Sequence, residues 1–306
     1  MKRLYDIQLI HIYGSSYFCS GKYAVGVYLD KSSKSAILVD SGPDEHSARA
    51  IDQQIADQGY RISAILHTHG HRNNYGGDRY FIERYPEVRI YSTAAALSWM
   101  THPDLEAICC GEIPSFYKNR EMPPVTDLLE ERDGPLPIEG IKFKVMTLPG
   151  HVPGTVGFVS PDNVLYCGDA VFGDKILKKQ SLLLYTDISE AKRTFRKLAE
   201  AEPKAYVVYH GGIYYEVSKL IDKHLGRMSQ LLMLVESRIK QKPVTLEMLV
   251  KQIMAHFSLE DGLEPYSLTS HIVRAYVAEL LDLDRIRARV REGTLFFEYR
   301  EPNNGF

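Results

Sequence analysis

The sequence predicts an α/β fold in the first part of the chain and a mostly helical region after it. Short β-branched or aromatic runs alternate with helical patterns up to about residue 210, and apolar residues take helical spacing from about residue 221. The chain has 306 residues, of which 44% are hydrophobic and 25% are charged. This composition excludes disordered and low-complexity proteins and allows a large hydrophobic core.

Each element of the first part is predicted from its local pattern. Helices are expected at 45–58, 76–85 and 187–201, the last with Asp187 as its N-cap. Residues 102–137 are rich in proline and lack periodicity, so we expect a long loop there, and its role as a lid stays open. Turn residues bound the expected strands, which are 23–28, 36–40, 62–66, 88–91, 141–148, 156–159, 164–167 and 205–209.

The pattern after residue 221 predicts three helices and a hairpin. A helix is expected around 221–240, and apolar stripes at 246–257 and 272–281 predict two more. Residues 286–290 and 295–299 alternate around the Glu292-Gly293 turn, which predicts a hairpin. Three helices followed by a hairpin is the order of a winged-helix module. We therefore expect two domains, 1–220 and 221–306.

Charge and cysteine content restrict the class of protein further. The net charge is −2 and the isoelectric point is about 6.6, which excludes a globally basic nucleic-acid coat. We find no apolar run typical of a signal peptide and no stretch of about 18 apolar residues that would span a membrane. The four cysteines form no CxxC pair. We expect a cytoplasmic protein with reduced thiols and no membrane partner.

Polar side chains stand at the ends of four predicted strands or in the turns between them. Side chains gathered from strand ends at one edge of a sheet are how α/β folds build sites, and neutral imidazoles are good zinc ligands. The residues concerned are His69 and His71 after the strand at 62–66, His151 in a Gly/Pro turn, Asp169 after 164–167, and His210 after 205–209.

These residues belong to a series of motifs with a known order. The series is Val39-Asp40-Ser41-Gly42, residues 68–77 (THGHRNNYGG), Gly150-His151-Val152-Pro153-Gly154, Gly168-Asp169 and His210-Gly211. It resembles the metallo-β-lactamase superfamily over residues 1 to about 220. The resemblance implies an αββα sandwich, in which two mixed sheets pack together with helices outside. The C-terminal part is similar to the winged-helix extension of one hydrolase branch of that superfamily.

The resemblance assigns roles residue by residue. Asp40 matches the acidic residue that braces the metal-binding loops from behind. A register that starts the motif at His67 displaces Gly76-Gly77, so we expect His67 to be structural. The implied ligands are His69, His71 and His151 at the first metal site, Asp169 as a bridge, and His210 at the second site.

Asn73 and Asn74 depart from the family pattern. Family members usually carry Asp and His at these positions, where both bind the second metal. An amide carries no charge and is not basic, so we expect one tight zinc site and a weak second site. Asp169 is then the residue expected to orient the attacking water.

We therefore expect a zinc-dependent hydrolase that uses a metal-bound water on a small-molecule ester, thioester, lactone or phosphodiester. Hydrolysis of a β-lactam itself is not expected. One alternative is a mononuclear iron oxygenase that resembles persulfide dioxygenases, with His69, His151 and Asp169 as its ligands. Another is a catalytically impaired relative that only binds its ligand.

A nucleic-acid-processing hydrolase is a further alternative. Arg285, Arg287, Arg289 and Arg291 fall on one face of the first hairpin strand, as contacts to phosphates would need. Residues 225–306 contain eleven Lys and Arg and eleven Asp and Glu, which does not favour a nucleic-acid partner. We expect the C-terminal module to cap the cleft or to mediate self-association as a homo-oligomer.

Overall fold

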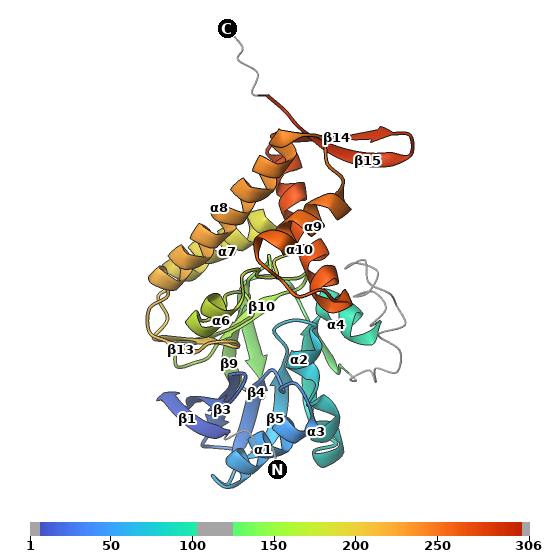
Figure 1. Cartoon of the computed structure of the whole chain (residues 1–306). Coiled ribbons are helices and arrows are strands. Elements are labelled where there is room, and N and C mark those ends of the chain that lie inside the picture. The colour runs from blue at the N-terminus through green and yellow to red at the C-terminus, as the bar shows by residue number, and fades with distance from the viewer. Residues whose placement is uncertain (1–6, 103–124, 302–306) are drawn as a thin grey trace.

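Two β-sheets packed face to face form one end of the molecule, and the C-terminal helices form the opposite end (Figure 1). The computed structural model describes residues 7–102 and 125–301. In the described part, no helix is both long and apolar enough to cross a membrane.

The first sheet has seven strands in sequence order, β1 to β7. Its first four strands are antiparallel and the pairs from β4 to β7 are parallel. The strands are β1 (Gln8–Tyr13), β2 (Ser16–Ser20), β3 (Val25–Asp30), β4 (Ser35–Val39), β5 (Arg61–Leu66), β6 (Arg89–Thr93) and β7 (Asp127–Leu129).

The second sheet has six strands in the order β13-β12-β11-β10-β9-β8. Only the pair β11 and β12 is parallel. The strands are β8 (Gly134–Ile138), β9 (Ile141–Thr147), β10 (Val156–Val159), β11 (Val164–Gly168), β12 (Ala205–Val208) and β13 (Gly212–Tyr214).

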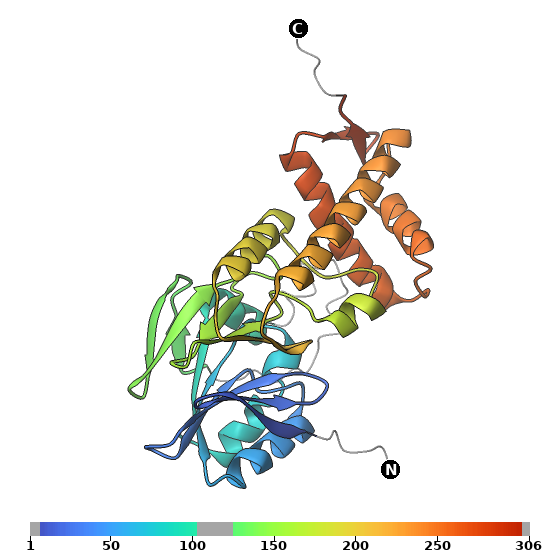
Figure 2. The same ribbon diagram turned by 90° about the vertical axis from the view of Figure 1, so that its left-hand side faces the viewer.

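Helices cover the outer faces of this sandwich and form the C-terminal region (Figure 2). The helix that the sequence places at 187–201 is confirmed, and the Asp187 side chain caps it by accepting from the Glu190 amide at 2.8 Å. The helices are α1 (Glu45–Ala56), α2 (Arg72–Tyr75), α3 (Asp78–Arg84), α4 (Ala94–Thr101), α6 (Asp174–Lys179), α7 (Ile188–Glu200), α8 (Ser218–Gln241), α9 (Leu246–His256) and α10 (Leu263–Asp282).

Three hydrophobic clusters hold the layers together. One lies between the sheets and includes Leu66 of β5 and Phe158 of β10. A second packs the first sheet against α1 and α3. The third packs the second sheet against α7 and continues through α8, α9 and α10, with Val235 and Leu280 fully buried. The α/β sandwich with a helical extension is therefore confirmed, and one continuous core joins the extension to the sandwich.

The expected C-terminal hairpin is also present, as β14 (Ile286–Arg291) and β15 (Thr294–Tyr299). Glu292 and Gly293 both have positive φ, at 50° and 74°, as a two-residue hairpin turn requires.

The prediction of a loop over residues 102–137 is wrong for the last part of that range. Residues 103–124 lie outside the described residues, but β7 and β8 occupy 127–129 and 134–138. The sequence pattern does not predict β8, because the strand contains Pro135 and Pro137 and proline lacks the N–H that a central strand needs. The strand tolerates both prolines since it lies at the edge of its sheet.

Gly26 of β3 is required by the packing of the two sheets. An added Cβ there would lie 2.6 Å from Cε1 of Tyr166 and 2.9 Å from Cβ of Val39. The Tyr166 ring cannot retreat easily, since its hydroxyl donates to the carbonyl oxygen of Val27 at 3.0 Å.

We predict that Gly26→Ala lowers the free energy of unfolding by roughly 1 to 3 kcal/mol, the usual cost of overpacking a core. Urea unfolding would measure the effect. Gly134→Ala in β8 is the matched control, because nothing lies within 4 Å of its added Cβ. Equal stabilities of the two variants would contradict this account of the packing.

Candidate metal centre

The polar strand ends meet at one edge of the sandwich. His69 and His71 follow β5 of the first sheet, while His151 lies between β9 and β10 of the second. Asp169 and His210 follow the adjacent parallel strands β11 and β12. The sheets are bridged at this edge, since the Val156 amide donates to the Thr68 carbonyl at 2.8 Å.

Four of these side chains direct ligand atoms toward one point. Nδ1 of His71 lies 3.0 Å from Nε2 of His69 and 3.1 Å from Nε2 of His151. Oδ2 of Asp169 lies 3.8 Å from each of those two Nε2 atoms. All four ligand atoms lie within 4.8 Å of one another, which is the spacing of groups that can share a metal ion.

Hydrogen bonds on the outer side of the rings assign the tautomers of two histidines. Nδ1 of His151 donates to the Leu184 carbonyl at 2.8 Å. Nδ1 of His69 lies 3.0 Å from Oγ1 of Thr68, whose own hydroxyl proton goes to Asp40 at 2.9 Å. Both rings therefore carry their proton at Nδ1 and turn an Nε2 lone pair toward the cluster, as metal-binding histidines do.

Burial keeps these histidines neutral. It lowers the pKa of His71 to about 3, with a further contribution from His151. Burial also lowers the pKa of His69 and of His151. For Asp169 the effect of burial is outweighed by His210, so the pKa of that carboxyl is lowered. The centre thus combines three neutral imidazoles with one carboxylate.

The donor set fits a divalent metal ion. In the described part, Oδ1 of Asp169 is buried and has no hydrogen-bond partner. Three lone pairs and a carboxylate that face each other away from water are costly unless a cation lies between them. Catalytic zinc sites have three protein ligands and keep a further position for water, so His69, His71 and His151 could hold zinc with Asp169 beside it.

His210 stands beside this group and outside it. Its Nε2 lies 3.2 Å from Oδ2 of Asp169, and its side chain is 16% exposed. Burial lowers the pKa of His210, but Asp169 outweighs that effect and the pKa is raised. The ring N–H of His210 therefore donates a hydrogen bond to the Asp169 carboxylate, which stays ionised.

The two asparagines have separate partners. Asn74 is fully buried, and its Nδ2 donates to Oδ2 of Asp40 at 3.0 Å. Its Oδ1 is buried without a hydrogen-bond partner among the described residues. The backbone carbonyl oxygen of Asn73 accepts a hydrogen bond from the Tyr209 hydroxyl.

Asp40 supports the loop that carries His69. It accepts from the amide of Thr68 at 2.9 Å and from the Thr68 hydroxyl, besides Asn74. Its φ of 63° is a left-handed conformation that is rare for a residue other than glycine. A backbone held in this way needs strong surrounding contacts, which these bonds supply.

His67 lies in the same loop, but its side chain contacts Asp78 and not the group around His69. It is fully buried, and its Nε2 lies 2.8 Å from Oδ2 of Asp78 at the start of α3. Burial would lower the pKa of His67, but Asp78 and Asp40 outweigh it and raise the pKa to about 9. His67 thus ties the end of β5 to α3, in agreement with the structural role expected for it.

Sequence reasoning missed the aromatic residues behind the centre. The Phe172 ring lies 5.5 Å from that of His151 and 5.8 Å from that of His210. The Tyr185 ring lies 6.2 Å from that of His151. His224 of α8 contacts both Phe172 and Tyr185. No motif marks these residues, because the contacts join segments far apart in the sequence.

Comparison with known sequences identifies relatives of this chain. The profile of the metallo-beta-lactamase superfamily matches residues 23–210. A hydroxyacylglutathione hydrolase of Synechococcus sp. (strain JA-2-3B'a(2-13)) is 27% identical over 42% of this chain and 46% of its own length. The probable metallo-hydrolase YflN of Bacillus subtilis (strain 168) is 25% identical over 60% of this chain and 78% of its own. The chain thus spans less than half of the first relative and over three quarters of the second.

Solved structures share the fold over nearly the whole chain. A metallo-beta-lactamase family protein from Thermus thermophilus has a TM-score of 0.70 at 18% identity, covering 96% of this chain and 98% of its own. A beta-lactamase domain protein from Burkholderia ambifaria has a TM-score of 0.72 at 15% identity, covering 95% and 93%. These likenesses extend over the C-terminal helices.

We predict that His224 makes the folded protein sensitive to acid. Burial lowers the pKa of His224 to about 4 from its usual 6.5, although the hydrogen bond with the Phe172 backbone opposes this effect. The folded protein therefore keeps His224 neutral while the unfolded chain takes up a proton, and stability is lost as the pH falls from 6.5 to about 4. The full difference amounts to roughly 2 to 3 kcal/mol.

Urea unfolding of metal-free protein between pH 7 and pH 4 would measure this loss. His224→Gln removes the ionisable group, so its stability should depend less steeply on pH than that of the wild type. The other histidines are common to both proteins and cancel in the comparison. Parallel pH profiles would contradict the prediction.

Proposed function

The chain belongs to the metallo-beta-lactamase superfamily, and we propose that it is a zinc-dependent hydrolase with one tight metal site. The observation that carries the proposal is the convergence of three neutral imidazoles and the Asp169 carboxylate within 4.8 Å. His69, His71 and His151 would hold the metal, with Asp169 beside it.

We propose a small thioester or ester as the substrate. Relatives named hydroxyacylglutathione hydrolase support the thioester, including one from Prochlorococcus marinus (strain MIT 9312) that is 23% identical over 74% of this chain and 82% of its own length. Metal-assisted hydrolysis requires only a polarisable carbonyl group, so lactones are candidate substrates as well.

Zinc bound here would supply a Lewis acid and make water acidic enough to act as a nucleophile near neutral pH. The protein supplies the groups that orient the water. Oδ1 of Asp169 is buried and has no hydrogen-bond partner among the described residues, so it can accept a hydrogen bond from the attacking water and orient it. Nε2–H of His210 donates to Oδ2 of Asp169 and keeps that carboxylate in place.

The engaged amide of Asn74 supports a single metal site. A second metal next to His210 would need charged or basic ligands from positions 73 and 74, and both are amides in this chain. Since Asn74 already donates to Asp40, its side chain serves the loop that carries His69.

We also propose the two-domain division at residue 220, with a winged-helix-like second domain. The order α8, α9, α10 and then the hairpin β14–β15 supports it. A cytoplasmic location is proposed as well, and it is supported by Cys19 and Cys167, which are buried free thiols.

We predict about one zinc ion per chain in protein purified without chelators or a nickel column, and release of thiol from a hydroxyacylglutathione thioester. Elemental analysis and a thiol assay would measure the two quantities. His151→Ala should lose the metal, and Asp169→Asn should lower kcat about 10²-fold by removing the carboxylate that orients the water. His256→Gln, at an exposed position on α9, is the control and should change neither.

Two outcomes would contradict the proposal. Iron in place of zinc would favour a mononuclear oxygenase, for which His69, His151 and Asp169 form a suitable set. Metal-loaded protein that cleaves no ester, thioester, lactone or phosphodiester would favour a binding role.

We further predict that Asn73→Asp with Asn74→His raises the metal content toward two ions per chain. The double variant restores an anion and an imidazole beside His210. Each single variant serves as the control and should stay near one ion. If the double variant neither gains metal nor changes in activity, the two asparagines are not the reason for a single site.

A further inference from the structure

We propose that His224 of α8 is a positioning residue for the metal ligands, so that the helix leading into the C-terminal region keeps the metal site in shape. The inference rests on the proposed function, because it assumes that His151 and Asp169 bind zinc. It goes further in giving a role to a residue that lies outside the ligand set.

His224 is fixed by two hydrogen bonds in a fully buried position. Its Nε2 lies 2.9 Å from the carbonyl oxygen and 3.2 Å from the amide nitrogen of Phe172, and its Nδ1 lies 3.2 Å from the Tyr185 hydroxyl oxygen. Its side chain is 0% exposed. Contacts at both ring nitrogens fix the orientation of the ring. The ring thereby ties α8 to the segment after β11 and to the one before α7, whose Phe172 and Tyr185 rings also contact each other at 5.7 Å.

Both partners of His224 touch the metal ligands. Phe172 follows Asp169 by three residues, and its ring packs against His151 and His210 at 5.5 Å and 5.8 Å. Tyr185 follows Leu184, whose carbonyl oxygen accepts from Nδ1 of His151 at 2.8 Å. A shift of either segment would therefore turn the His151 ring or displace Asp169.

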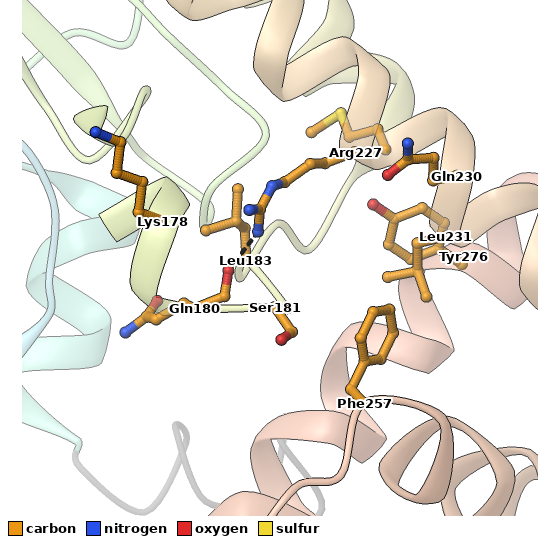
Figure 3. Close-up of a pocket in the computed structure, with 10 residues that line it drawn as sticks. Lys178, Gln180, Ser181, Leu183, Arg227, Gln230, Leu231, Phe257 and Tyr276 are labelled. Carbon is orange, nitrogen blue, oxygen red and sulfur yellow. Dashed lines mark hydrogen bonds between the residues drawn. The ribbon is translucent and has the colours of Figure 1, made fainter. Parts of the chain in front are cut away.

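Both packing and hydrogen bonds hold the segment between these two partners. A cavity of about 220 Å³ separates part of it from the C-terminal helices. Figure 3 shows this cavity, and at its rim Arg227 of α8 donates a hydrogen bond to the backbone carbonyl oxygen of Gln180. The lining includes Ser181, Leu183, Leu231, Phe257 and Tyr276. Since side chains do not fill this space, hydrogen bonds from α8 add to the packing of buried side chains such as Leu177 and Leu182 in holding the segment.

Arg227 lies one turn after His224 and holds a different part of the segment. Its guanidinium donates to the carbonyl oxygens of Leu177 and Gln180, at the end of α6. These contacts stabilise the last turn of a helix and touch none of the four ligand residues. Arg227 therefore provides a control for the general docking of α8.

The test compares zinc affinity among variants of the full chain, measured by competition with a chromophoric chelator. His224→Phe keeps a ring but loses both hydrogen bonds, and we expect about a tenfold weaker affinity, as for other residues that support metal ligands. His224→Gln retains a donor and an acceptor and should restore much of the loss. Tyr185→Phe removes one hydroxyl and should weaken binding in the same direction with little risk to folding.

A spectroscopic readout separates positioning from stability. The visible absorption of the Co²⁺-substituted protein reports ligand geometry, and it should change in His224→Phe and return toward wild type in His224→Gln. Arg227→Gln should lower stability while leaving zinc affinity and the cobalt spectrum unchanged.

Three results would overturn the inference. Folded His224→Phe and Tyr185→Phe that keep wild-type affinity and spectrum would show that neither bond positions the ligands. An equal loss in Arg227→Gln would show that only the docking of α8 matters. A wild-type chain that binds no zinc would overturn the proposed function, and this inference with it.

Discussion

Three imidazole lone pairs and one carboxylate have to stay turned toward the same buried point, and most of the contacts around them serve this requirement. Nδ1 of His71 lies about equally far from Nε2 of His69 and Nε2 of His151, at 3.0 Å and 3.1 Å. Neutral rings can approach so closely only if their protons are held on the outer side. The Leu184 carbonyl and the Thr68 hydroxyl do this for two of the rings.

Support for this arrangement comes from both sheets. Asp40 binds the backbone and hydroxyl of Thr68 from behind, while His67 and Asp78 tie the same loop to α3. The two sheets also approach closely here, since a Cβ on Gly168 would lie 2.7 Å from Cβ of Thr68. Gly168 has a positive φ of 55°, so both the close approach and the backbone conformation favour glycine. The ligand loops are thus held by many short contacts on elements that cannot move independently.

The C-terminal helices are part of the same construction. They share one hydrophobic cluster with the second sheet and α7, and that cluster includes Phe172 and Tyr185, which lie beside His151. A change in how α8 packs is therefore transmitted to residues that contact His151. This continuity gives the extension a physical link to the chemistry of the site, through contacts that can be altered one at a time.

The order of residues along the chain was enough to indicate which side chains carry chemistry and which kind of fold presents them. Histidines and an aspartate after β-branched runs, in a fixed order of motifs, predicted the sandwich and nominated the residues now seen together. Local patterns also predicted α7 with its cap and the Glu292-Gly293 turn, because a helix start and a tight turn depend on neighbouring residues alone.

What lies behind the ligands is visible only in the folded chain. Nothing near His224 in the sequence relates it to Phe172 or Tyr185, and the Leu184 carbonyl has no side-chain signal at all. The strand β8 was missed because its two prolines are tolerated only at a sheet edge, and edges are defined by the assembled sheet. Hydrogen bonds between distant segments and positions within a sheet are properties of the packed chain, so a linear pattern does not contain them.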